Sequence, residues 1–277
     1  MSKTLVYTVS NFTKDTNRCT ALLVQSLKLH NTDFDFCVMS DTEPPQKYPY
    51  NTVVDKGYAK YIPEGKGWAG LTRYSDLLPK NYDHYIYFDS DVLCFAKLNE
   101  IFPPQDKVIS VATEYISLPD AQGNWKEIIR NMSDIYYCYP AATPEEKLEM
   151  TKYIGFNVGV MGFKNLDVHK RVKAYIDNVL IDMIHSAKDH HSKIYSLDQT
   201  PLNYFCFKNM DKVNDIHLQV NNFTRGTRLH NRKALAKSVN IFHFTGIDQG
   251  MAAKAHHMEN FWEYREANVH EEHLSKI

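Results

Sequence analysis

The sequence predicts an α/β fold whose central sheet is mostly parallel, twisted and flanked by helices. In the first half of the chain, short β-rich segments alternate with longer segments of helical periodicity, as in a doubly wound sheet. The segment Tyr85–Phe88 shows no polar alternation, which is typical of a strand buried on both faces. Right-handed crossovers would bring the carboxyl ends of such strands to one edge, where open α/β sheets bind ligands.

The first half is expected to hold four strands and two helices. Apolar residues recur on one face of the segment 16–29, as in a helix that packs on a sheet. Pro79 and Asn81 would end the second helix. The predicted strands are 5–9, 34–39, 52–55 and 85–88, and the predicted helices are 16–29 and 71–78.

The second half is less regular. Residues 114–150 are polar, aromatic and interrupted by prolines and glycine, which predicts an insertion that covers a site or contacts a partner. The glycines within 155–163 indicate a close approach of backbone. The predicted strands are 107–112 and 239–244, the predicted helices are 167–183 and 198–205, and the tail from Met251 is expected to form a surface helix. No repeat or linker divides the chain, so we expect a single domain.

Composition excludes several function classes. The chain of 277 residues has 32 basic and 33 acidic side chains, so its formal net charge of −1 gives no support for binding nucleic acid. We see no apolar signal or anchor segment and therefore expect a cytoplasmic protein with no transmembrane segment. The five cysteines are widely spaced and lack a CxxC pair, which predicts free buried thiols and no zinc site.

Two aspartates, Asp89 and Asp91, directly follow the buried strand, with Ser90 between them. Carboxylates at the end of a buried strand are costly unless water or a divalent metal offsets their charge. Oxygen ligands suit Mg²⁺ or Mn²⁺, which keep open positions for substrate phosphates. An isolated Asp-x-Asp is more often a polar turn with an Asp cap, so this short pattern alone favours the turn, and the rest of the chain has to decide.

Three later segments bear on that choice: Phe156–Val160, Ser196–Asn203 and Ile241–Gly246. Each has an ordinary explanation when taken singly: a turn residue, a helix cap and a hydrogen-bonded core histidine. Taken together in this order and spacing, the four segments resemble the glycosyltransferases of family 8, which have the GT-A fold. The set is far more specific than any one of its members.

The resemblance covers roughly residues 3–250 and implies a single GT-A, Rossmann-like domain over 1–277. Its nucleotide-binding half would span about 1–112 and its acceptor-side half about 113–277. The implied activity is transfer of a sugar from a UDP-sugar to a glycan or other hydroxyl acceptor, with retention of anomeric configuration.

By this resemblance, Asp89 and Asp91 match the metal-binding pair, and His243 matches the third protein ligand. The family's usual ion is Mn²⁺, and an imidazole among oxygen ligands favours Mn²⁺ over Mg²⁺, which stays the alternative. A fixed divalent cation stabilises the negative charge that develops on a departing nucleoside diphosphate.

The resemblance also implies which residues hold the donor. The expected set is Tyr7, Thr8, Val9, Asn11, Arg73, Asp76, Ser90, Gly246 and Gln249. Core packing is an equally good explanation for Tyr7, and a surface ion pair for Asp76. An Arg grips phosphate or sugar hydroxyls through two parallel hydrogen bonds, which suits Arg73 to this place.

Asn157, Asp198 and Gln199 match residues around the transferred sugar. The Gln199 carbonyl would lie near the anomeric carbon of an oxocarbenium-like transition state in a front-face attack. Asp198 would hold the sugar hydroxyls or support Gln199. Double displacement needs a carboxylate nucleophile at that carbon, and Asp198 is the nearby candidate.

One departure from the family pattern concerns the diphosphate. Members often carry a lysine where this chain has Gln249, which brings no charge. Lys254, Arg225 or Arg228 could supply the missing positive charge beside the diphosphate. The departure keeps a second class of function open, a GT-A binding module that holds a nucleotide or glycan without transfer. A third is an inverting transferase, which would need a general base such as Glu114 or Asp120.

The expected partners are therefore a UDP-sugar donor and a glycan, lipid-linked or protein-linked acceptor. Assembly of two copies of the chain into a homodimer is a further possibility. The particular sugar, the acceptor and the linkage are not specified by the sequence.

Overall fold

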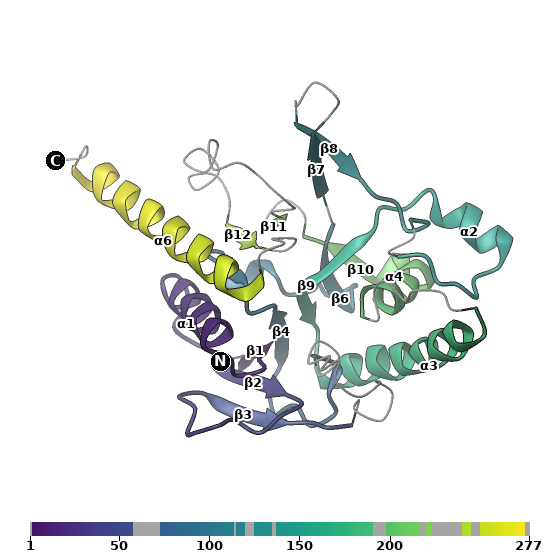
Figure 1. Ribbon diagram of the computed structural model, residues 1–277, viewed down its shortest axis with the longest axis horizontal. Coiled ribbons are helices and arrows are strands. Elements are labelled where there is room, and N and C mark those ends of the chain that lie inside the picture. The colour runs from purple at the N-terminus through teal and green to yellow at the C-terminus, as the bar shows by residue number, and fades with distance from the viewer. Residues whose placement is uncertain are drawn as a thin grey trace.

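The fold is built around a seven-stranded sheet with helices on both sides (Figure 1). The computed structural model describes residues 2–57, 73–113, 115–119, 125–134, 137–190, 198–216, 220–222, 240–244 and 250–274. Among these residues, no helix is long and apolar enough to cross a membrane.

The strands of the central sheet lie in the order β10-β6-β9-β4-β1-β2-β3. β1 pairs in parallel with β2 and β4, β2 with β3, and β10 with β6. β9 runs antiparallel to β4 and β6, so the sheet is mostly parallel, as predicted. The strands are β1 (Thr4–Val9), β2 (Asp35–Ser40), β3 (Asn51–Val54), β4 (His84–Phe88), β6 (Ile109–Thr113), β9 (Phe156–Phe163) and β10 (Val213–Asp215).

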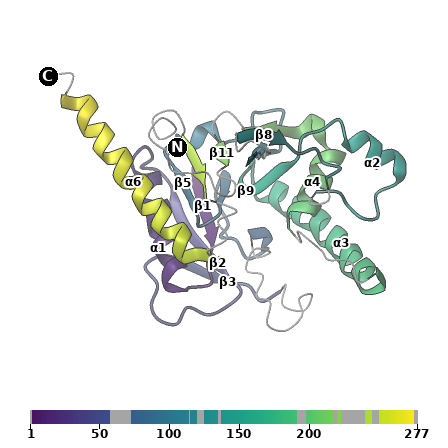
Figure 2. The same cartoon turned by 45° about the horizontal axis from the view of Figure 1, so that its top comes forward.

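The central strands are buried on both faces because helices cover each side. Tyr7 belongs to a core that includes side chains of α3 (Leu166–His190) and α4 (Gln199–Lys208). Its neighbour Val6 belongs to a second core on the opposite face, with side chains of α1 (Lys14–Lys28). Successive side chains of a strand point to opposite faces, so the apolar run of each strand serves two cores. Figure 2 shows α1 and α3 on opposite sides of the sheet.

A smaller sheet carries the C-terminal helix. It contains β5 (Val92–Cys94), β11 (Val220–Asn222) and β12 (Ile241–His243), in the order β11-β12-β5. The helix α6 (Gly250–Leu274) packs on this sheet and lies beside α1 in both views (Figures 1 and 2). The predicted tail helix is therefore present, and its apolar side forms a third core with the small sheet.

The segment 114–150, predicted to be an insertion, contains a hairpin and a short helix. β7 (Tyr115–Pro119) pairs antiparallel with β8 (Trp125–Ile129), and Figure 1 shows the hairpin standing away from the central sheet. α2 (Pro144–Met150) begins with a capping box between Thr143 and Glu146. What this segment contacts in function stays a prediction. Two 3-10 turns complete the fold, η3 (Leu98–Glu100) and η4 (Met210–Lys212).

The helix predicted at 71–78 is wrong over its described part. Residues 73–74 form a 3-10 turn, and 76–78 form turns and a bend. The carbonyl of Arg73 accepts from the Tyr7 hydroxyl and lies 3.1 Å from Nε2 of His169 instead of bonding along a helix. The hydroxyl of Ser75 accepts from the N–H of Leu77 at 3.0 Å, a local bond that competes with helix formation. Residues 71 and 72 lie outside the described part.

Candidate active site

Sheet pairing brings the two aspartates of the Asp-Ser-Asp segment beside the late histidine. Asp89 directly follows β4, and its N–H donates to the carbonyl of Gly159 in β9 at 2.8 Å. The carbonyl of Asp91 accepts from Phe244 N–H at 2.9 Å, next to β12. The antiparallel register of β5 and β12 places His243 opposite Val92, so residues separated by about half the chain meet at one point.

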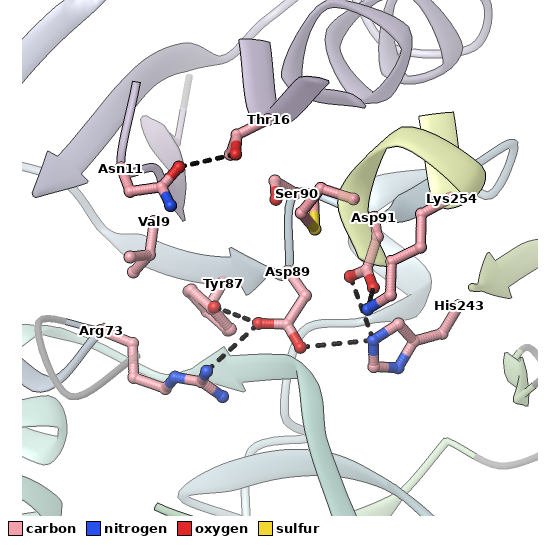
Figure 3. Close-up of a pocket in the computed structure, with 11 residues that line it drawn as sticks. Val9, Asn11, Thr16, Arg73, Tyr87, Asp89, Ser90, Asp91, His243 and Lys254 are labelled. Atoms are coloured by element: carbon pink, nitrogen blue, oxygen red, sulfur yellow. Dashed lines mark hydrogen bonds and ion pairs between the residues drawn. The ribbon is translucent and has the colours of Figure 1, made fainter. Parts of the chain in front are cut away.

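The three side chains form a compact set of candidate metal ligands (Figure 3). Nε2 of His243 lies 3.3 Å from Oδ2 of Asp89 and 3.3 Å from Oδ1 of Asp91. The three ligand atoms all lie within 4.8 Å of one another. Asp91 and His243 are buried, and Asp89 is partly exposed. Two carboxylate oxygens and one imidazole nitrogen suit Mn²⁺, so the residues present fit a divalent metal.

The charges of this cluster stabilise one another. Burial favours the neutral form of Asp89, but the charges of Arg73 and His243 outweigh it and hold the pKa of that carboxyl below its usual range. Burial acts in the same way on Asp91, and His243 with Lys254 holds its pKa well below the usual range. Burial lowers the pKa of His243, yet the two carboxylates raise it to about 9. The cluster is therefore a pair of ionised carboxylates among cations.

Gly159 leaves the space that the imidazole occupies. A Cβ at this position would overlap the ring of His243 and come within 2.8 Å of Oδ1 of Asn157. The N–H of Gly159 donates to that same oxygen at 2.7 Å. The glycine predicted to mark a close backbone approach thus packs against the third candidate ligand.

Arg73 connects the candidate metal ligands to the start of α4. Its Nη2 lies 3.3 Å from Oδ1 of Asp89 and 3.2 Å from Oδ2 of Asp198. The guanidinium stacks over the ring of Tyr87 at 4.8 Å, and the Tyr87 hydroxyl donates to Asp89. Arg73 is itself buried, so this network fixes its head group. Asp198 caps α4 by accepting from the N–H of Gln199.

These groups border a cavity of about 240 Å³ at the carboxyl end of β4. Seven of the residues predicted to bind donor or metal line it: Val9, Asn11, Arg73, Asp89, Ser90, Asp91 and His243. Figure 3 shows Asp89 at its centre, with Arg73 on one side and His243 and Lys254 on the other. The predicted sheet edge and the predicted ligands therefore coincide.

Three predicted donor residues lie apart from the cavity lining. Tyr7 is fully buried, and its hydroxyl donates to the carbonyl of Arg73 at 3.0 Å. Thr8 is also fully buried, and its hydroxyl has no hydrogen-bond partner within the described part of the chain. Asp76 is exposed and forms an ion pair with Lys173 at 3.3 Å. For Tyr7 and Asp76, these contacts match the alternatives of core packing and a surface ion pair.

The three residues predicted to act on the sugar come from β9, which carries Asn157, and from the start of α4, where Asp198 is the cap and Gln199 the first residue. Asn157 is buried and accepts from Gly159. Nε2 of Gln199 donates to the carbonyl of Phe156 at 3.3 Å, which fixes the orientation of its amide. None of Asn157, Asp198 and Gln199 lines the described cavity, and Asp198 is joined to it through Arg73.

Some candidates lie outside the described residues. These are Gly246 and Gln249 of the donor set, Arg225 and Arg228, and the general bases Glu114 and Asp120 considered for an inverting enzyme.

Four cavity residues were not among the predicted site residues: Thr16, Tyr87, Met251 and Lys254. Nζ of Lys254 lies 2.5 Å from Oδ2 of Asp91. Tyr87 lies two residues before Asp89, so the two side chains point to the same face of the chain there, and this spacing was the local signal that could have marked it. Met251 and Lys254 reach the cavity only because α6 docks on the small sheet.

The sequence profile described as Glycosyl transferase family 8 matches residues 72–248, which include all the cavity residues between Arg73 and His243. The chain belongs to glycosyltransferase family 8. This membership confirms the predicted enzyme class, a glycosyltransferase. No curated protein sequence matches the chain.

Solved structures of similar fold are also glycosyltransferases. The chain is similar to the bifunctional glycosyltransferase WbbM (TM-score 0.53, 15% identity, 88% of this chain and 46% of that one). It is similar to an active-site mutant of LgtC (TM-score 0.51, 14% identity, 95% of each chain). It is also similar to GlyE from Streptococcus pneumoniae (TM-score 0.50, 17% identity, 100% of this chain and 64% of that one). The chain thus spans less than two thirds of WbbM and of GlyE. These likenesses confirm the GT-A fold.

Proposed function

We propose that this chain transfers a sugar from a UDP-sugar to a hydroxyl acceptor, with retention of configuration, and that it requires Mn²⁺. The observation that carries the proposal is the meeting of Asp89, Asp91 and His243 beside Arg73 in one cavity. We propose that one domain performs this reaction, with the donor on the side of β1 and β4 and the acceptor on the side of β9 and α4.

Asp89, Asp91 and His243 would hold the metal ion. Their ionised carboxylates and imidazole form the appropriate donor set, and the ammonium of Lys254 already lies against one of them as a positively charged substitute. When bound, a divalent cation supplies positive charge opposite the diphosphate leaving group. Mg²⁺ has the same charge and stays the alternative ion.

The chain's own residues then position the sugar. Arg73 holds Asp89 and Asp198 on one guanidinium nitrogen and thereby fixes the distance between the donor side and α4. Asp198 caps α4 and would accept hydrogen bonds from sugar hydroxyls. The amide nitrogen of Gln199 donates to the carbonyl of Phe156, and its carbonyl oxygen is the end that would face the anomeric carbon. A partial negative charge there would stabilise an oxocarbenium-like transition state.

A donor screen tests this proposal. The protein is incubated with UDP-glucose, UDP-galactose and UDP-N-acetylhexosamines, with Mn²⁺, Mg²⁺ or chelator, and released UDP is measured. We expect slow UDP release from one donor, dependent on the metal, and product NMR that shows the donor's anomeric configuration. Asp91→Asn should abolish the release because it removes one ionised ligand. An inverted product would contradict retention, and binding of UDP without release from any donor would support a binding module instead.

A further inference from the structure

Lys254 holds the oxygen of a candidate metal ligand. Nζ of Lys254 lies 2.5 Å from Oδ2 of Asp91, whose other oxygen faces His243 at 3.3 Å. The Asp91 side chain is only 7% exposed and that of Lys254 only 19%, so little water separates the two charges. A charge-assisted hydrogen bond between two largely buried groups is among the stronger interactions that a lysine forms. Figure 3 shows Lys254 approaching the carboxylate from the same side as His243.

The position of Lys254 is fixed by the docking of α6. Ala255, the next residue, is fully buried, as are Met258 and Phe261 further along the helix. These side chains form the third core with Phe242 of β12 and Leu93 of β5. The backbone of Lys254 is thus held against the small sheet, while its four-carbon side chain can still redirect the ammonium.

A second contact, which lies outside the cavity, also holds α6 in place. The guanidinium of Arg18 in α1 forms hydrogen bonds to both carboxylate oxygens of Glu259 in α6, the shortest at 2.6 Å. Arg18 does not line the cavity. The docking of α6 and the contact between Lys254 and Asp91 can therefore be perturbed separately.

Arg73 and Lys254, which both line the described cavity, differ in how firmly they are held. Arg73 contacts Asp89 and Asp198, donates to the carbonyl of Val158, and is buried. Within the described part of the chain, the ammonium of Lys254 forms one ion pair, with Asp91. An ammonium whose partner is a metal ligand loses that attraction once the ligand's charge is neutralised by a divalent cation. A diphosphate in the same cavity offers it several anionic oxygens.

We propose that Lys254 binds the diphosphate of the donor, and that it exchanges Asp91 for phosphate when the metal site is filled. This inference rests on the proposed function. It assigns two roles to a residue of α6: binding the diphosphate of the donor, and restraining metal binding before the donor enters. The two roles predict that one substitution of Lys254 strengthens Mn²⁺ binding and weakens UDP binding. A purely structural ion pair would not produce this opposite pair of effects.

Isothermal titration calorimetry of the full chain tests the proposal with three probes: Mn²⁺ alone, and UDP or uridine at saturating Mn²⁺. Removing the nearby positive charge in Lys254→Met should tighten Mn²⁺ binding about fivefold or more. The same variant should weaken UDP binding about tenfold or more because a charge-assisted bond to phosphate is lost. Uridine, which has no phosphate, should bind equally to both proteins, and Lys254→Arg should retain much of the UDP affinity.

Arg18→Met serves as the matched control, since it weakens the docking of α6 without touching the cavity. It should lower the melting temperature and leave UDP binding unchanged. Unchanged UDP affinity in Lys254→Met, or an equal loss in Arg18→Met, would overturn the proposal. Absence of Mn²⁺-dependent UDP binding in the unmodified protein would instead contradict the proposed function itself, so the two failures are distinguishable.

Discussion

The carboxylate of Asp198 lies 3.2 Å from Nη2 of Arg73. The same nitrogen lies 3.3 Å from Asp89, so one guanidinium joins the first residue of the Asp-Ser-Asp segment to the cap of α4. The sequence resemblance assigned these three residues to metal, donor and sugar separately. In the structure they form one network, and a change in Arg73 should therefore affect both the metal side and the sugar side.

Arg73→Met should lower the free energy of unfolding by about 3 kcal/mol, because it leaves two carboxylates of low exposure without their shared cation. Arg73→Lys should recover much of that loss in stability. It should still release UDP more slowly than the unmodified protein, since a single ammonium cannot reproduce the planar set of donors of a guanidinium. Urea unfolding and UDP release measure the two effects. The control is Lys152→Met, which breaks an exposed pair with Glu149 and should leave stability nearly unchanged. Full activity in Arg73→Lys would contradict this assignment.

Gly159→Ala should weaken Mn²⁺ binding about tenfold or more, because the added methyl group overlaps His243 and must displace its ring. The control lies in the same strand. Gly162→Ala would overlap the carbonyl of Ile101, neither residue lines the described cavity, and the change should cost stability without changing Mn²⁺ affinity. Calorimetric titration with Mn²⁺ and thermal unfolding separate the two variants. Equal Mn²⁺ affinities for both would show that His243 is not a ligand.

The sequence was most informative where function depends on residues next to strand ends. The family resemblance implied that Asp89, Asp91 and His243 belong to one site, and the structure brings their side chains together. Asp89 directly follows β4, Asp91 directly precedes β5, and His243 ends β12. The sequence offered Lys254 only as one of three possible sources of the charge missing at Gln249. It could not indicate that Lys254 contacts Asp91, since its position depends on how a separate helix packs on a three-stranded sheet.

Contacts between distant parts of the chain also explain why the helix predicted at 71–78 was wrong. Its local pattern was helical, but the Arg73 carbonyl is taken by Tyr7 and His169, which lie 66 and 96 residues away in the chain. Partners at such separations are invisible to a reading of local periodicity. The strands, by contrast, were predictable because two-sided burial requires apolar residues at consecutive positions.

Tyr7→Phe should lower the free energy of unfolding by about 1 kcal/mol, the usual cost of one buried hydrogen bond, because the Arg73 carbonyl loses a donor. UDP affinity should change little, since the ring is fully buried and does not line the described cavity. Asn11→Ala supplies the comparison: Asn11 does line the cavity, and its loss should weaken UDP binding. A large loss of UDP affinity in Tyr7→Phe would restore the predicted contact of its hydroxyl with the nucleotide.

His169 should make the protein sensitive to acid. It is fully buried in α3, and Nε2 donates to the carbonyl of Arg73 at 3.1 Å. Burial lowers the pKa of His169 to about 4, with smaller effects from that carbonyl, from Asp76 and from Lys173 and Lys170. In the unfolded chain the pKa would return to about 6.5, so the unfolded state binds the proton first as pH falls.

Stability should therefore decrease as pH falls from about 6.5 to about 4, by up to about 3 kcal/mol from this residue, since each pKa unit corresponds to about 1.4 kcal/mol. His169→Gln retains a side-chain donor for the Arg73 carbonyl but cannot titrate. Its free energy of unfolding, measured in urea at several pH values, should change less between pH 6.5 and 4 than that of the unmodified protein. Parallel curves for the two proteins would show that other groups cause the acid sensitivity.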